Sequence, residues 1–128
     1  MSPGDAPLYV HAHDLDVWLV ARVGGWGESG QRLIGAALVD AAHAVLGGVS
    51  VGLTFPRARV DALRAADHAL LNLRVLARVA HDAGLFDRTQ RRFVIDAADA
   101  MGRMLGGWRR RVDRPPDDFE EVAPGPCA

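Results

Sequence analysis

The sequence predicts an all-α fold: an up-and-down bundle of four helices in one domain. Apolar residues recur every three or four positions in four long segments, and glycine or proline interrupts the chain between them. Long helices joined by short connections favour antiparallel neighbours. At 128 residues, 49% of them hydrophobic, the chain can bury a core of its own. Only 6% are aromatic, so leucine, valine and alanine are expected to fill most of that core.

The first two helices are expected over residues 8–23 and from 31 to about 51. Leu15 and Leu19 belong to the helical spacing of the first segment, and the glycine-rich stretch 24–30 marks the loop that follows. The second segment is rich in small and apolar residues: Leu33, Ala37, Val39, Ala41, Ala44, Val45 and Leu46. Its small side chains would let a neighbouring helix approach closely.

The third helix is expected over residues 57–83, with Gly84 as its C-terminal stop. Its predicted core stripe is Val60, Leu63, Ala66, Leu70, Leu73, Ala77 and Ala80. The fourth helix is expected to begin near Asp87, which has capping-box spacing to Gln90. Its predicted stripe is Phe93, Ala97, Ala100, Met104 and Trp108. The prolines at 115 and 116 would end it.

The bundle is expected to occupy residues 8–114, between two disordered ends. Residues 1–7 lack the basic start and apolar run of a signal peptide. Residues 115–128 form an acidic, proline-rich tail that cannot bury enough apolar surface to order itself. No apolar stretch reaches the ~18 residues that would argue for a membrane span. A single cysteine, Cys127, cannot form an intramolecular disulfide, so a cytoplasmic location is expected.

The net charge of −1 hides an uneven distribution. All 15 basic residues are arginines. Residues 1–56 hold two Arg and five acids (−3), residues 57–114 hold thirteen Arg and seven Asp (+6), and residues 115–128 hold four acids and no base (−4). A basic half of this kind favours an anionic partner.

Four arginines gather where the fourth helix should end: Arg109, Arg110, Arg111 and Arg114. Adjacent guanidiniums can grip phosphates, each with a bidentate fork. The alternative is that they complement the helix dipole, although one cation would satisfy it. The acidic tail follows at once and could fold back to screen the cluster.

Arg74 and Arg78 are four residues apart and like-charged, so each is expected to meet an acid or an anionic partner. Both are candidate contacts for nucleic acid or for a partner, with pairing between subunits as the alternative for Arg74. Two further pairs have opposite charges at this spacing and are expected to form local ion pairs: Arg92 with Asp96, and Asp99 with Arg103.

Residues suited to catalysis or metal binding are sparse. Asp40 and His43 form one Asp-x-x-His, whereas a di-iron bundle needs two Glu-x-x-His motifs and two further Glu. Ser29 and Ser50 stand in no nucleophile-elbow sequence. Cys127 has no activating partner nearby in the sequence. No metal, no cofactor and no enzymatic activity are therefore expected.

The stretch 70–111 carries a resemblance to a known family. Its features are Leu-Arg-Val-Leu at 73–76, the short loop Gly-Leu-Phe at 84–86, Gln90, and Gly-Arg-Met-Leu-Gly-Gly-Trp at 102–108. This stretch resembles the second helical hairpin of the four-helix-bundle family of Avd, the accessory variability determinant of diversity-generating retroelements. The family also includes proteins encoded in intervening sequences of ribosomal RNA genes. The resemblance extends over residues 8–114.

The resemblance implies a homopentameric barrel of four-helix protomers. It also implies a non-catalytic accessory role, in which the protein binds a reverse transcriptase and its template RNA, with DNA as a further candidate, and supports mutagenic cDNA synthesis. The alternative is a structural or interaction bundle with no nucleic-acid role. Gly106 and Gly107 leave a similar choice: they allow close contact with another protomer or the polymerase at Trp108, or Trp108 simply completes the core.

Overall fold

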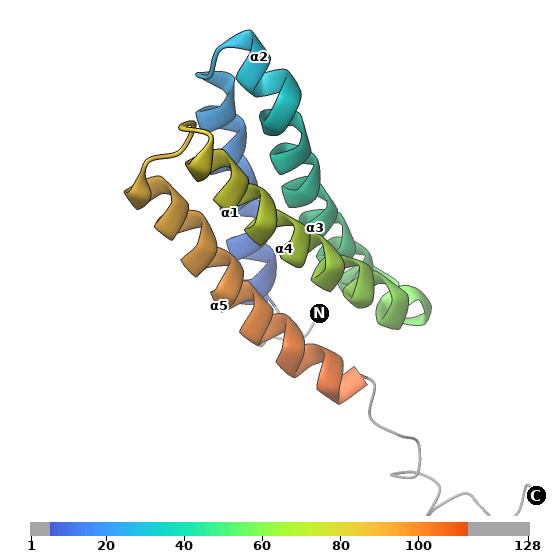
Figure 1. The fold of residues 1–128 in the computed structure, drawn as a ribbon. Coiled ribbons are helices and arrows are strands. Elements are labelled where there is room, and N and C mark those ends of the chain that lie inside the picture. Colours follow the sequence, from blue (N-terminus) through green and yellow to red (C-terminus); the bar gives the residue numbers. More distant parts are fainter. Residues whose placement is uncertain (1–5, 113–128) are drawn as a thin grey trace, which may run out of the picture.

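The structure, a computed structural model, describes residues 6–112, which fold into four long helices with no strand among them (Figure 1). The long helices are α1 (Ala6–Gly24), α3 (Ala36–Thr54), α4 (Arg59–Asp82) and α5 (Arg88–Val112). Three short elements join them: α2 (Glu28–Gly30), a π-helical turn (Gln31–Gly35) and a 3-10 turn (Pro56–Ala58). The predicted all-α fold with four helices is confirmed.

Each long helix runs antiparallel to the one before it, and both ends of the described chain lie at the same end of the bundle (Figure 1). α3 packs against α1 and α4, and α4 packs against α5. α5 also meets α1, through a thinner contact, and so closes the ring of four helices. The predicted up-and-down arrangement is therefore the observed one.

Two helices begin earlier than expected. α1 starts at Ala6, inside the segment 1–7 that was predicted to be disordered. The second helical segment starts at Glu28, because α2 and the π turn continue directly into α3. The side-chain amide nitrogen of Gln31 donates hydrogen bonds to the backbone carbonyls of Gly24 and Trp26. These bonds hold the loop after α1 against the start of the second helical segment. The predicted acidic tail, 115–128, lies outside the described residues.

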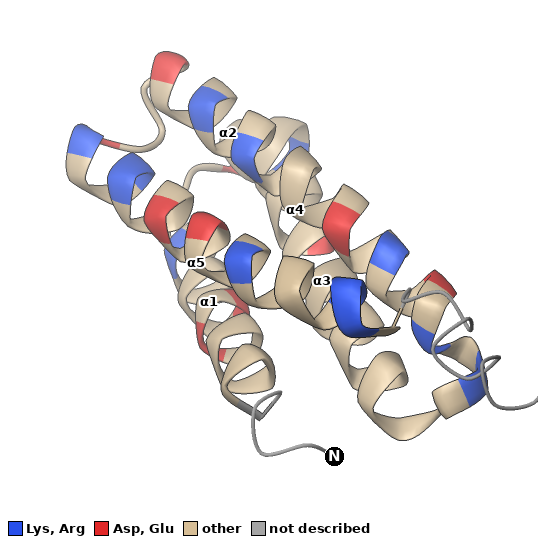
Figure 2. Ribbon diagram, turned by 90° about the horizontal axis from the view of Figure 1, so that it is seen from below, with Lys and Arg blue, Asp and Glu red and all other residues tan. Residues whose placement is uncertain are grey.

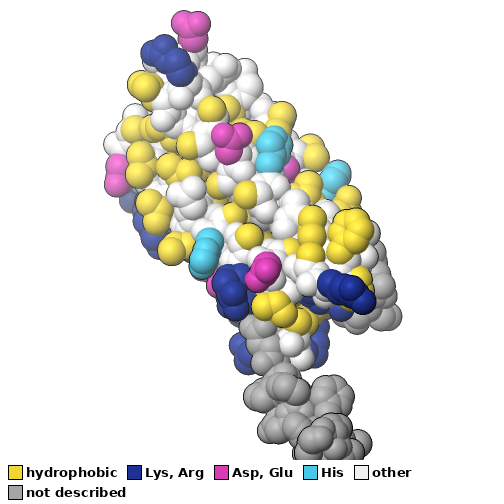
Figure 3. All heavy atoms as spheres, turned by 90° about the vertical axis from the view of Figure 1, so that its right-hand side faces the viewer, with side chains coloured by type: hydrophobic (Ala, Val, Ile, Leu, Met, Phe, Trp, Pro, Cys, Tyr) yellow, Lys and Arg dark blue, Asp and Glu magenta, His cyan; other side chains and the backbone are white. Residues whose placement is uncertain are grey.

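The continuous helix Glu28–Thr54 is unusually apolar. Its mean hydropathy is 1.6 over an 18-residue window, of which 33% is buried. By length and composition this helix could cross a membrane, which differs from the expectation from the sequence. The core helices of soluble proteins can have the same length and hydropathy. Much of its apolar surface faces outward, as the yellow areas over this side of the molecule show (Figure 3).

The predicted core stripe of α4 is confirmed except at its first residue. Val60 is 37% exposed. The other six predicted residues are fully buried: Leu63, Ala66, Leu70, Leu73, Ala77 and Ala80. α4 packs on α3 along one side and on α5 along the other, so its inward face is unambiguous.

The predicted stripe of α5 is wrong except at Trp108. The buried residues are Val94, Ala98, Met101, Leu105 and Trp108, one position later than predicted for all but the last. Both sets have helical spacing, and the contacts of α5 with α4 and α1 decide between them. Phe93 is 46% exposed. Its ring lies 4.7 Å from that of Trp18, so it covers the seam between α1 and α5.

Gly48 sets the distance between α3 and α4. A Cβ atom at this position would lie 2.7 Å from the carbonyl oxygen of Ala62 and 2.9 Å from the Cβ of Ala66. Those atoms belong to backbone and to a rigid side chain, so neither can move aside cheaply. Gly47, one residue earlier, faces open space.

We predict that Gly48→Ala lowers the free energy of unfolding by about 1–3 kcal/mol, because the added methyl group forces α3 and α4 apart. Gly47→Ala is the matched control, and it should raise the same quantity by up to ~1 kcal/mol through better helix propensity. Urea denaturation followed by circular dichroism measures both. Equal effects of the two substitutions would contradict this account of the α3–α4 packing.

Candidate nucleic-acid interface

The positive charge of the bundle lies on the α4–α5 hairpin (Figure 2). Residues 59–112 hold eleven Arg and six Asp, a net charge of +5. The rest of the described chain, residues 6–58, holds three Arg and four acids, a net charge of −1. The outward surface of this hairpin is therefore where an anionic partner would bind.

Arg74 joins α4 to α5. Its Nε donates to Oδ1 of Asp99 at 2.9 Å, and its Nη2 donates to the carbonyl oxygen of Ala98 at 3.3 Å. The side chain is only 24% exposed. A Cβ atom on Gly102 would lie 2.6 Å from Nη2, so glycine at 102 makes room for this guanidinium. Arg74, a predicted contact residue, is thus occupied within its own chain.

Arg109 makes the second connection between these helices. Its Nη1 donates to Oδ2 of Asp67 at 2.7 Å, and its side chain is 28% exposed. Two of the six predicted contact residues therefore form interhelical ion pairs that fix α5 on α4. The charge-assisted bonds are short, and the partial burial of both arginines shields them from water.

The two local ion pairs predicted on α5 are wrong. Asp99 pairs across to Arg74 on α4 and not with Arg103 on its own helix. Among the described residues, Arg92 and Asp96 form no ion pair with each other either. The physical reason is that a partner on the facing helix offers Asp99 a less exposed environment than a side chain one turn along the surface.

Arg78, Arg91 and Arg92 surround a hollow of about 290 Å³ on the hairpin surface, together with Ile95 and Asp96. Arg78 and Arg92 are exposed, and Arg91 is partly buried. Arg78 was predicted as a contact residue, whereas Arg91 and Arg92 were not. Three arginines from two helices line the hollow with one aspartate, and this excess of positive charge suits a bound phosphate.

Nearness to the hairpin turn is the sequence signal for this cluster. In an antiparallel pair of helices, residues near the connecting turn on either helix lie at the same end of the pair. The turn is centred near Leu85, and Arg78 and Arg92 each lie seven positions from it. Their nearness to the turn therefore predicts that both arginines lie at the same end of the hairpin.

The predicted C-terminal cluster lies at the opposite end of α5. Arg110 and Arg111 are exposed in the last turn of the helix, and Arg114 lies outside the described residues. Within residues 6–112, Gly106 and Gly107 meet no other backbone, and the nearest atoms to their Cβ positions belong to Arg110 and Arg111. Trp108 is 4% exposed and belongs to the core cluster. This burial agrees with the second of the two alternatives, in which Trp108 completes the core.

Metal binding at His43 finds no geometric support. Its Nδ1 lies 2.6 Å from Oδ2 of Asp16 on α1, and Asp40 is not its partner. Throughout the described part of the chain, no three His, Cys, Asp or Glu side chains come together in a way that could hold a metal ion.

Comparison with protein-family models, curated proteins and solved structures finds no match for this chain. The resemblance of residues 70–111 to the Avd family therefore stays a prediction.

We predict that Arg74→Gln lowers the free energy of unfolding by about 1 kcal/mol, because it leaves Asp99 and the carbonyl of Ala98 without their charged donor. Arg78→Gln, one turn away and exposed, should change it by less than ~0.5 kcal/mol. Thermal and urea unfolding of the two variants beside wild type measure the difference. Equal losses would show that Arg74 contributes nothing beyond an exposed arginine.

Proposed function

We propose that this chain is a non-catalytic accessory protein that binds RNA through the α4–α5 hairpin and supports a reverse transcriptase. The observation that carries the RNA-binding part is the group of Arg78, Arg91 and Arg92 around one hollow. Guanidiniums bind phosphate oxygens in bidentate fashion, and a single carboxylate, Asp96, does not neutralise three of them.

The binding is electrostatic and weakly selective for sequence. Phosphate contacts position a nucleic acid without reading its bases. Arginines with exposed or partly exposed side chains lie near both ends of the hairpin: Arg78, Arg91 and Arg92 near the turn, and Arg110 and Arg111 near the end of α5. A single strand running along the hairpin would meet phosphate-binding groups at each end.

The part of the proposal that concerns a reverse transcriptase and a retroelement rests on the resemblance of residues 70–111 to the Avd hairpin. The structure adds a physical reason for part of that pattern, because Gly102 accommodates the guanidinium of Arg74. In a ring of protomers the arginine clusters would repeat, so that modest contacts add through effective concentration.

Self-association is the second part of the proposal, and it is supported by the surface between α3 and α4. A hollow of about 370 Å³ there is lined by small or apolar residues and one acid: Ala44, Gly47, Gly48, Val51, Ala58, Asp61, Ala62 and Ala65. Small residues allow a helix of a second copy to approach closely. A pentamer is the assembly that the resemblance implies.

The alternative function is an interaction bundle without a nucleic-acid role. The outward apolar surface of Glu28–Thr54 favours it, because an apolar helix surface suits a protein partner equally well. An RNA-binding titration separates the two functions.

We predict that the triple variant Arg78→Gln, Arg91→Gln, Arg92→Gln binds single-stranded RNA more weakly than wild type. Each phosphate neutralised adds about 0.7 to the slope of log affinity against log salt, so removing three should reduce the slope by about 2. Fluorescence anisotropy with a labelled oligouridine, at several salt concentrations, measures both quantities.

The matched control carries Arg22→Gln, Arg32→Gln and Arg57→Gln, which removes the same charge outside the α4–α5 hairpin. A further variant, Arg110→Gln with Arg111→Gln, tests the far end of α5. If the control weakens binding as much as the triple variant, only net charge matters and the hollow is not the site. If wild type binds no RNA at low salt, the interaction-bundle alternative holds.

We predict that the protein is an oligomer, with a mass that is a multiple of 13.7 kDa. Ala44→Glu combined with Ala65→Glu should yield the monomer, because two carboxylates would be buried in the contact. Ala36→Glu is the control, since this exposed alanine of α3 lies on the side of α1. Size-exclusion chromatography with light scattering decides it, and a wild-type mass of 13.7 kDa at micromolar concentration would contradict the prediction.

A further inference from the structure

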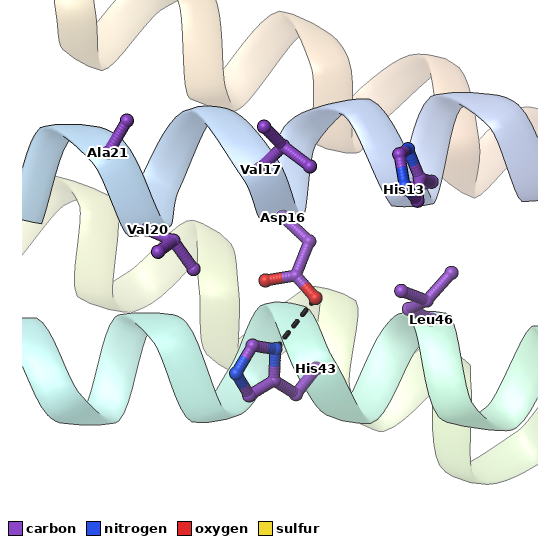
Figure 4. A pocket seen from close by; sticks show the side chains of 7 residues that line it. All are labelled: His13, Asp16, Val17, Val20, Ala21, His43 and Leu46. Carbon is purple, nitrogen blue, oxygen red and sulfur yellow. Dashed lines mark hydrogen bonds and ion pairs between the residues drawn. The ribbon is translucent and has the colours of Figure 1, made fainter.

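A groove between α1 and α3 contains a buried carboxylate that lacks one hydrogen-bond partner. The groove measures about 450 Å³ and is open on its outer side, which lies away from the arginines of α4 and α5. Its lining is almost entirely hydrocarbon (Figure 4). The lining residues are His13, Asp16, Val17, Val20, Ala21, His43 and Leu46.

Asp16 is the polar group of this groove that its own chain leaves incomplete. The residue is 6% exposed. Its Oδ2 lies 2.6 Å from Nδ1 of His43, while its Oδ1 is buried and has no hydrogen-bond partner among the described residues. A buried carboxylate oxygen without a donor is costly, and native proteins rarely leave one so.

The unpartnered oxygen points along the groove. Figure 4 shows the Asp16 carboxylate between the two helices, with one oxygen joined to His43 and the other directed towards Val20. Val17 and Val20 are 56% and 50% exposed, so the hydrocarbon beside this oxygen is accessible from outside. The groove therefore has an unsatisfied acceptor directly beneath an apolar wall.

The charges around the groove select the kind of ligand. No arginine lines it, and its charged residues are Asp16 and any histidine that carries a proton. Asp14, two residues before Asp16 on α1, is exposed beside His13 and does not line the groove. An anion would be repelled, and a neutral apolar molecule would leave Oδ1 of Asp16 without a donor. A cation that carries N–H groups satisfies both requirements.

We propose that the α1–α3 groove binds a small organic cation, an ammonium or guanidinium group on a short hydrocarbon body. The cationic group donates to Oδ1 of Asp16, and the hydrocarbon packs on Val17, Val20 and Leu46. The volume of the groove lies within the range of about 300–1,000 Å³ found for small-molecule sites. His43 is a positioning residue, because its ring nitrogen holds the other carboxylate oxygen.

The first experiment titrates the full chain with n-hexylammonium, n-hexanol and hexanoate by isothermal calorimetry. We expect saturable binding of n-hexylammonium, at least tenfold weaker binding of n-hexanol and none of hexanoate. A tenfold loss corresponds to about 1.4 kcal/mol. Equal binding of n-hexylammonium and n-hexanol, or no saturable binding of the cation at millimolar concentration, would overturn the proposal.

Asp16→Asn and Asp14→Asn form a matched pair on one helix. The first replaces the buried carboxylate and should weaken n-hexylammonium binding at least tenfold, with n-hexanol unchanged. The second replaces the exposed carboxylate, whose side chain is 72% exposed, and should leave both affinities within twofold. Equal losses in the two variants would mean that general electrostatic attraction, and not this site, holds the cation.

A second test does not depend on how Asp16→Asn folds, and one of its two measurements, the melting temperature, needs no ligand. Val20→Lys places an ammonium group four residues after Asp16, in the favourable order for an i, i+4 pair, and inside the groove. It should raise the melting temperature above that of Val20→Met and abolish n-hexylammonium binding. Lysine and methionine have similar helix propensities, so Val20→Met is the control. A melting temperature no higher than the control, or retained binding, would contradict the proposal.

Discussion

The close approach of α3 and α4 at Gly48 is the constraint on which the rest of the bundle depends. With few aromatic residues to fill space, the core relies on leucine, valine and alanine, and such a core reaches native packing density only when the helices lie close together. Gly48, Ala62 and Ala66 permit that distance. Once α4 is fixed on α3, its inward stripe is determined, and α5 and α1 must cover what remains.

The same packing sorts the arginines into two groups. Arg74 and Arg109 lie where α4 faces α5, so they find Asp99 and Asp67 and act as interhelical links. Arg78 and Arg92 lie further outward and stay exposed. A hairpin can thus use one residue type for two purposes, because the position of each arginine around the helix decides whether an acid or the solvent faces it.

Sequence periodicity predicted what depends on one helix at a time. It identified the four helices and the buried stripe of α4, because both follow from the spacing of apolar residues. It misplaced the stripe of α5, where two sets of residues share helical spacing and only contact with the neighbouring helices distinguishes them. Gly84 and the Asp87–Gln90 capping box were predicted correctly, since both are local: Gly84 has a φ of 82°, and each capping residue bonds the other's backbone.

The candidate sites depend on pairs that are distant in the chain, and the sequence revealed them only in part. Arg78 was found from its charge, but Arg91 and Arg92 required the geometry of the hairpin. Asp16 and His43 are 27 positions apart on different helices, so no local pattern links them. The spacing of Asp40 and His43 suggested that these two residues could act together. In the structure the carboxylate that contacts His43 belongs to Asp16 on α1.

The aromatic residues divide unevenly between the two ends of the bundle. Trp18 and Trp26 meet Phe86 at the end where α4 turns into α5. Trp108 lies near the other end, beneath the guanidinium of Arg59 at 5.9 Å and close to Gly52. The emission of an indole responds to its immediate surroundings, so the three tryptophans form two separate optical reporters. Fraying of either end would alter one emission signal while leaving the other unchanged.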